Sequence, residues 1–162
     1  MGCLSADEKS MINLNRVELD VLRKLLEKRV KFVIIGGRAV NFHGIFRGAP
    51  DLDLFYSKGR DNSLCLLDAL RQFGGDNLTP DSLSAIVQIN IYGNPIQLHS
   101  EIDGISFTDV YAQAVFVVLE GVCLPFISYA HLLENKRIVG LKSGRNKDLD
   151  DVLELSELDR EK

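Results

Sequence analysis

Apolar positions follow two different spacings along the chain, and each spacing predicts one type of element. Short runs of continuous or alternating apolar residues predict strands, and these lie at 31–35, 51–56, 85–92, 95–99, 115–119 and 122–126. Stretches with apolar residues three or four positions apart predict helices, and these lie at 13–29 or 15–29, 38–43, 62–73, 106–114, 128–139 and 147–158. The order of elements predicts an α/β (α+β) fold with a mixed β-sheet flanked by helices.

Turn and cap residues separate these elements. Asn13 or Asn15 is placed to cap the first helix, and Glu18 stands where a capping box needs an acid. Gly93-Asn94 and Glu120-Gly121 each separate two predicted strands and indicate β-hairpins.

Length and composition indicate one globular domain. The chain has 162 residues, of which 46% are hydrophobic and 26% are charged, an ordinary globular balance. We expect the domain to span 13–158, after a disordered start at 1–12 and before a charged tail at 159–162. No apolar run approaches the roughly 20 residues of a membrane span, so no membrane partner is expected.

The three cysteines, Cys3, Cys65 and Cys123, have no spacing typical of a metal site. Two of them lie in apolar surroundings. We expect all three to be reduced thiols of a cytoplasmic protein.

Charge is segregated along the chain. The net charge is −4, which argues against a protein that coats nucleic acid nonspecifically. Residues 72–135 contain no Lys or Arg, whereas 136–147 contain five basic residues and no acid, and 148–162 contain seven acids and two basic residues. A local basic surface for a triphosphate or a tRNA end therefore remains compatible with the sequence.

Asp51 and Asp53 form the first candidate site. Side chains alternate along a strand, so the two carboxylates point to the same face with their Cα atoms about 6–7 Å apart. Two such like charges are commonly satisfied by a hard divalent cation such as Mg²⁺. The alternative interpretation is a pair of solvated acids on an exposed edge strand.

Gly36-Gly37 forms the second candidate site, because it follows an apolar strand and precedes a short helix. Glycines let a phosphate approach the backbone closely, and a helix N-terminus offers free N–H groups. The same pattern also occurs as a simple tight turn. Thirteen residues separate Gly37 from Asp51, so the two sites together are suited to a nucleoside triphosphate and its Mg²⁺.

The segment FVIIGGRAVNFHGIFRGAPDLDLF resembles the signature of the polymerase-beta-type nucleotidyltransferase superfamily. It is most similar to the small bacterial branch related to abortive-infection (AbiEii-like) toxins, although Ala49 stands where Thr is usual. The segments ISYAHLLENKR and GRNKDLDDV resemble C-terminal blocks of that branch. The positions that match the N-terminal signature are Gly36, Gly37, Ala39, His43, Gly44, Arg47, Asp51, Leu52 and Asp53.

The resemblance implies transfer of a nucleoside monophosphate from a nucleoside triphosphate to an acceptor hydroxyl. Asp51 and Asp53 are then the catalytic residues and the ligands of Mg²⁺ or Mn²⁺. A tRNA 3′ end or a protein side chain is the implied acceptor, and a toxin role with an antitoxin partner is the implied setting. The implied nucleotide-binding residues are Gly36, Gly37, Arg47, Lys136 and Arg145.

Gln97 departs from the family pattern, which has a third carboxylate at this position. A neutral amide offers one oxygen to a metal but takes no proton from a nucleophile, so we expect activity to be weakened, altered or lost. His99 shares the face of Gln97 and is placed to reach inward as a base. The alternative function is therefore a catalytically weakened nucleotide- or partner-binding module. An antibiotic-modifying transferase is less favoured, because no additional substrate domain is evident.

The charges of the C-terminal blocks have two interpretations. Lys136, Arg145 and Lys147 are placed so that their charges can converge on a triphosphate or an RNA backbone. The alternative is a solvated helix–loop whose basic residues pair with Asp148, Asp150 and Asp151, and we favour it for Arg137 and Lys142. For Asp148 and Asp151 we expect structural pairing and stabilisation of a helix N-terminus.

Overall fold

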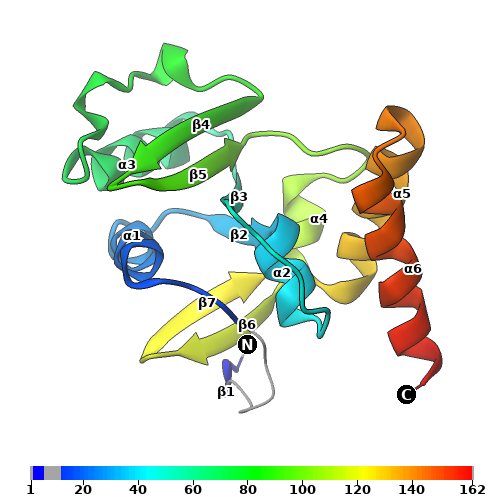
Figure 1. Cartoon of the computed structure of the whole chain (residues 1–162). Helices are drawn as coiled ribbons and strands as arrows, with labels where there is room; N and C mark the ends of the chain where they lie inside the picture. Colours follow the sequence, from blue (N-terminus) through cyan, green and yellow to red (C-terminus); the bar gives the residue numbers. More distant parts are fainter. Residues whose placement is uncertain (1, 6–11, 162) are drawn as a thin grey trace.

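A seven-stranded mixed sheet organises the molecule, with strand order β1-β6-β7-β2-β3-β5-β4 (Figure 1). The computed structural model describes residues 2–5 and 12–161. The strands are β1 (Leu4–Ser5), β2 (Phe32–Ile35), β3 (Leu52–Tyr56), β4 (Ile86–Ile91), β5 (Asn94–His99), β6 (Val115–Leu119) and β7 (Val122–Phe126). This mixed sheet with its helices confirms the predicted fold class.

The helices lie close to their predicted positions. They are α1 (Arg16–Glu27), α2 (Gly36–Phe42), α3 (Arg60–Arg71), α4 (Phe107–Ala112), α5 (Tyr129–Ser143) and α6 (Asn146–Arg160), with short 3₁₀ turns at Gly75–Asn77 and Pro80–Ser82. α1 packs against α3, and α5 packs against α6 to form a C-terminal helical pair (Figure 1). No helix of the described residues is long and apolar enough to cross a membrane.

The first helix shows how local sequence fixes an element. Asn15 is its N-cap: the Asn15 side chain accepts from the backbone N–H of Glu18, and the Glu18 carboxylate accepts from the backbone N–H of Asn15. This reciprocal pair is the expected capping box. The apolar face of α1 buries Val21, Leu22 and Leu25 completely.

Strand register brings distant residues to one place. β2 runs antiparallel to β3 and pairs Ile35 with Asp53, while β3 runs parallel to β5 and pairs Asp53 with Gln97. The end of β2, the acidic start of β3 and the end of β5 therefore meet on neighbouring strands.

The two predicted hairpins are present. Their turns place Tyr92-Gly93 and Glu120-Gly121 at positive φ, as two-residue hairpin loops require. The first turn lies one residue earlier than predicted, and Asn94 begins β5 instead.

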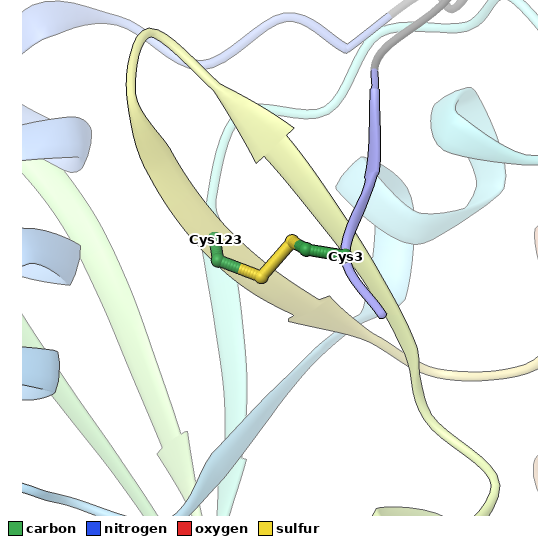
Figure 2. The surroundings of a disulfide bond; sticks show 2 residues. All are labelled: Cys3 and Cys123. Atoms are coloured by element: carbon green, nitrogen blue, oxygen red, sulfur yellow. A yellow bond between two sulfur atoms is a disulfide. The ribbon is translucent and has the colours of Figure 1, made fainter. Parts of the chain in front are cut away.

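The prediction of three reduced thiols is wrong for two of the cysteines. Figure 2 shows Cys3, just before β1, joined to Cys123 of β7 by a disulfide, with Cα atoms 6.3 Å apart. Cys65 is free and partly buried. The pairing links positions 120 residues apart, and it depends on β1 and β7 both lying beside β6, which local sequence around each cysteine does not reveal.

The two chain ends also differ from expectation where they are described. Leu4–Ser5 forms a strand parallel to β6 within the start predicted to be disordered, and residues 1 and 6–11 of that start lie outside the described residues. α6 continues to Arg160, so the helix reaches into the predicted charged tail.

Candidate active site

A cleft of about 630 Å³ contains every residue that the sequence proposed for the site. Its lining combines the β2–α2 junction, the start of β3, the end of β5 and the α5–α6 turn. The predicted residues in the lining are Gly36, Gly37, Arg47, Asp51, Asp53, Lys136 and Arg145.

Gly36 is required by the carboxylate beside it. A Cβ atom at Gly36 would collide with the side-chain carboxylate of Asp53, and Gly36 has a φ of 66°. Both conditions favour glycine over every other residue. α2 begins at Gly36 rather than at the predicted Arg38, so the glycines belong to the helix start instead of a preceding turn.

Gly37 accommodates the loop that leads into β3. A Cβ atom at Gly37 would lie 2.8 Å from the Cβ of Ala49 and 3.7 Å from Nη2 of Arg47. Ala49, which replaces the Thr usual in the resembling family, therefore packs directly against the glycine pair.

Each of the two acids is in contact with a β5 side chain. The amide Nε2 of Gln97 donates to Oδ2 of Asp51 over 3.2 Å, and Nε2 of His99 lies 3.1 Å from Oδ1 of Asp53. All four side chains line the cleft. The expectation that Asp51 and Asp53 face the same way, and that His99 reaches inward, agrees with this geometry.

The donor set allows a limited metal site. Carboxylate oxygens of Asp51 and Asp53 are the hard ligands that Mg²⁺ prefers, and the carbonyl oxygen of Gln97 is a neutral donor. Over residues 2–5 and 12–161, no group of three or more His, Cys, Asp and Glu side chains is placed to hold a metal ion. The residues therefore fit one divalent cation held by two carboxylates with water in its remaining positions, and they lack the third carboxylate of a two-ion site.

Two of the cleft cations are held by acids of α6. Arg47 contacts Asp151 twice, with Nε 2.8 Å from Oδ1 and Nη2 2.9 Å from Oδ2. Nζ of Lys136 lies 2.7 Å from Asp148 and 3.1 Å from Asp151. This contact confirms the structural pairing expected for the two aspartates.

Two other cleft cations are free of such partners. Arg145 and Lys147 are exposed and line the cleft at the α5–α6 turn, and no ion pair involves either one in the described part of the chain. The sequence groups Lys147 with Lys136 and Arg145 as charges that can converge on a triphosphate, but it does not assign Lys147 to the nucleotide-binding residues. Its position two residues after Arg145, across the start of a helix, was the available signal.

The remaining candidates lie outside this arrangement. Lys142 pairs with Asp103 over 2.9 Å on the exposed surface, and Arg137 is exposed on α5. Nε2 of His43 lies 2.7 Å from the carbonyl oxygen of Ile127, and its ring packs against Tyr129. His43 is therefore a packed histidine.

Comparison with known proteins adds a likeness of fold. No protein-family model and no curated protein sequence matches this chain. A candidate nucleotidyltransferase from Thermotoga maritima, TM1012, has a similar structure: 18% of residues are identical, the match covers 93% of this chain and 98% of that chain, and the TM-score is 0.54. The two proteins share a fold.

A second solved structure is less similar. ANT(2″)-Ia in complex with adenylyl-2″-tobramycin matches with 13% identity over 86% of this chain and 94% of that chain, with a TM-score of 0.49. This weaker likeness supports no conclusion about the present chain.

Proposed function

We propose that this protein binds a nucleoside triphosphate with Mg²⁺ in the cleft and transfers a nucleoside monophosphate to an acceptor hydroxyl. The observation that carries the proposal is the convergence of two carboxylates, a glycine pair and an unpaired cation in one cleft. Asp51 and Asp53 lie beside Gly36-Gly37, and Arg145 lines the same cleft from the α5–α6 turn. The shared fold with TM1012, itself a candidate nucleotidyltransferase, supports the same proposal.

The chain's residues divide the work of binding and orientation. Asp51 and Asp53 would hold the cation, which when bound polarises the triphosphate and offsets charge on the departing pyrophosphate. The glycine pair admits the phosphates close to the backbone, and Arg145 lines the same cleft from the α5–α6 turn to receive them. Arg47 and Lys136 line the same cleft with their charges already held by α6.

The reaction joins the acceptor oxygen to the α-phosphorus. The bond between the α-phosphorus and the oxygen that bridges to the β-phosphorus breaks, and pyrophosphate leaves. The acceptor hydroxyl loses its proton to solvent or to a neighbouring base, and His99 is the imidazole nearest to the acids.

The acceptor and the setting rest on the family resemblance of the sequence. A tRNA 3′ end or a protein side chain is the proposed acceptor. A toxin-type activity restrained by an antitoxin partner is the proposed biological role. A reaction that consumes nucleoside triphosphates suits the cytoplasm, although the Cys3–Cys123 disulfide removes the thiol argument for that location.

The hydrogen bond from Gln97 to Asp51 favours a second candidate function. An amide in this position satisfies one acid without a metal and leaves the site one carboxylate short. A nucleotide-binding module with little or no transfer activity would have this arrangement.

Incubation with each α-labelled nucleoside triphosphate, Mg²⁺ or Mn²⁺, and either total tRNA or cell lysate tests the proposal. The expected result is a labelled acceptor with the parent protein and none with Asp51→Asn/Asp53→Asn. Label transfer that survives this double substitution would refute the site. Triphosphate binding without any labelled acceptor would support the second candidate function.

A further inference from the structure

We infer that Asp151 is a positioning residue for triphosphate binding: it fixes Arg47 and Lys136 inside the cleft wall, so that the phosphates are received by Arg145 and Lys147. The inference rests on the proposed function and goes beyond the structural pairing that the sequence predicts for Asp151.

The contacts of Asp151 link three parts of the molecule. Its carboxylate accepts a hydrogen bond from Nη2 of Arg47 and also lies 2.8 Å from Nε of Arg47 and 3.1 Å from Nζ of Lys136. Arg47 belongs to the loop between α2 and β3, Lys136 to α5 and Asp151 to α6. One carboxylate thus joins the loop that leads to Asp51 with both C-terminal helices.

Burial makes these contacts costly to break. The side chain of Asp151 is 3% exposed and that of Lys136 is 10% exposed. Breaking a buried ion pair leaves an uncompensated charge away from water, which is strongly unfavourable. Arg47 and Lys136 therefore stay with the α6 acids when an anion enters the cleft.

Arg47, held by Asp151, lies next to the glycine pair. Its Nη2 atom lies 3.7 Å from the position a Cβ of Gly37 would occupy, beside Ala49. Because its guanidinium is held by Asp151, Arg47 forms a fixed part of the cleft lining next to Gly37. Arg47 belongs to the loop that precedes Asp51, so this loop is held as well.

The ion pairs between α5 and α6 also fix the turn that carries Arg145 and Lys147. α6 begins at Asn146, directly after Arg145, and its buried Asp148 holds Lys136 of α5 over 2.7 Å. Arg145 and Lys147 flank Asn146 and line the cleft without an acid partner among the described residues. Holding α5 and α6 together at Asp148 and Asp151 fixes where these two charges stand.

Asp151→Asn tests the inference, and Asp150→Asn is its matched control. Asp150 is the exposed neighbour on the same helix and forms no ion pair in the described part of the chain. Equilibrium affinity for a non-hydrolysable triphosphate with Mg²⁺ is measured well below the unfolding temperature of each variant. We expect Asp151→Asn to bind at least about tenfold more weakly than the parent, and Asp150→Asn to bind like the parent.

A double-variant cycle separates positioning from a purely structural role. If Asp151 acts by placing Lys147, the affinity losses of Asp151→Asn and Lys147→Gln overlap, and the double variant binds more tightly than the product of the two losses predicts. Losses that multiply would overturn the inference. If Asp151→Asn does not fold, Asp151→Glu takes its place in the cycle, since it keeps the buried negative charge but displaces the carboxylate by one methylene group.

The outcomes for the two proposals are distinct. A parent protein that binds no triphosphate refutes the proposed function and this inference with it. A parent that binds while Asp151→Asn binds equally well refutes the inference alone.

Discussion

The side-chain amide of Gln97 donates a hydrogen bond to the carboxylate of Asp51 over 3.2 Å, on the strand next to β3. In the resembling family a third carboxylate stands at this position. The amide gives Asp51 a neutral hydrogen-bond partner. Two carboxylates with such a partner repel each other less than three carboxylates would, so a bound cation stabilises this cleft less.

Gln97→Asp should therefore convert the site into a stronger metal site. Three neighbouring carboxylates repel one another, so we expect the free energy of unfolding in EDTA to fall by about 1 kcal/mol, and Mg²⁺ to restore it. Mg²⁺ affinity should rise about tenfold with the added charge. Urea unfolding and calorimetric titration measure the two effects.

Gln72→Asp is the matched control, because Gln72 is exposed at the end of α3 and does not line the cleft. It should change neither Mg²⁺ affinity nor the response to Mg²⁺. Unaltered Mg²⁺ affinity and transfer activity in Gln97→Asp would contradict the role given to the third position.

Gly36→Ala should displace the carboxylate of Asp53 and strain the backbone at position 36. The added Cβ collides with that carboxylate, and the φ of 66° is itself unfavourable for Ala. Gly121→Ala has a similar φ of 77° and nothing within 4 Å of its Cβ. We expect Gly121→Ala to lower the free energy of unfolding by about 1–2 kcal/mol and to leave Mg²⁺ affinity unchanged.

Gly36→Ala should lower the free energy of unfolding further, by about 2–4 kcal/mol in all, and should also lose Mg²⁺ binding. Urea unfolding and Mg²⁺ titration of both variants make the comparison. Equal losses of stability with intact Mg²⁺ binding would show that Gly36 serves the backbone alone.

Much of the fold could be predicted because its signals are local. β6 and β7 match their apolar runs, and α1 begins at one of the two caps that the sequence offered, Asn15. Asp51 lies immediately before β3 and Asp53 lies within it, and the alternation of the two positions was enough to predict that both acids face one side. The family spacing supplied the glycine pair and Arg145, which the fold brings into the same cleft.

The features that sequence did not reveal depend on contacts between distant segments. Cys3 meets Cys123 because β1 and β7 lie on either side of β6. The division of the cleft cations is also tertiary, since the sequence favoured ligand contact for Lys136, whereas the fold places its ammonium group beside Asp148 and Asp151 of α6.

The disulfide should contribute to stability through the long segment it closes. Cys3 and Cys123 are separated by 120 residues, and a cross-link of that span restricts the unfolded chain strongly. We expect Cys3→Ser to lower the free energy of unfolding by about 2–4 kcal/mol relative to the oxidised parent. Cys65→Ser, which leaves the disulfide intact, is the control in the same urea titration.

Reducing agent provides a second check on the disulfide. The parent should lose stability on reduction, while Cys3→Ser should not respond. A parent that unfolds identically with and without reductant would show that the bond has no part in the stability of the fold.

Arg145 and Lys147 should account for much of the electrostatic attraction of triphosphate. Replacing either one with Gln should weaken triphosphate affinity roughly five- to tenfold, whereas Arg137→Gln, an exposed cation of α5 outside the cleft lining, should not. The dependence of affinity on ionic strength should also become shallower in the two cleft variants. Equal effects at all three positions would indicate a general charge effect rather than a binding site.

The most direct measurement of the central claim is the binding of a non-hydrolysable nucleoside triphosphate to the parent and to Asp51→Asn/Asp53→Asn, each with Mg²⁺ and with EDTA. The cleft account predicts Mg²⁺-dependent binding by the parent, and a loss of at least about tenfold in affinity, together with the Mg²⁺ dependence, in the double variant. Equal affinity of both proteins, or parent binding that ignores Mg²⁺, would contradict it.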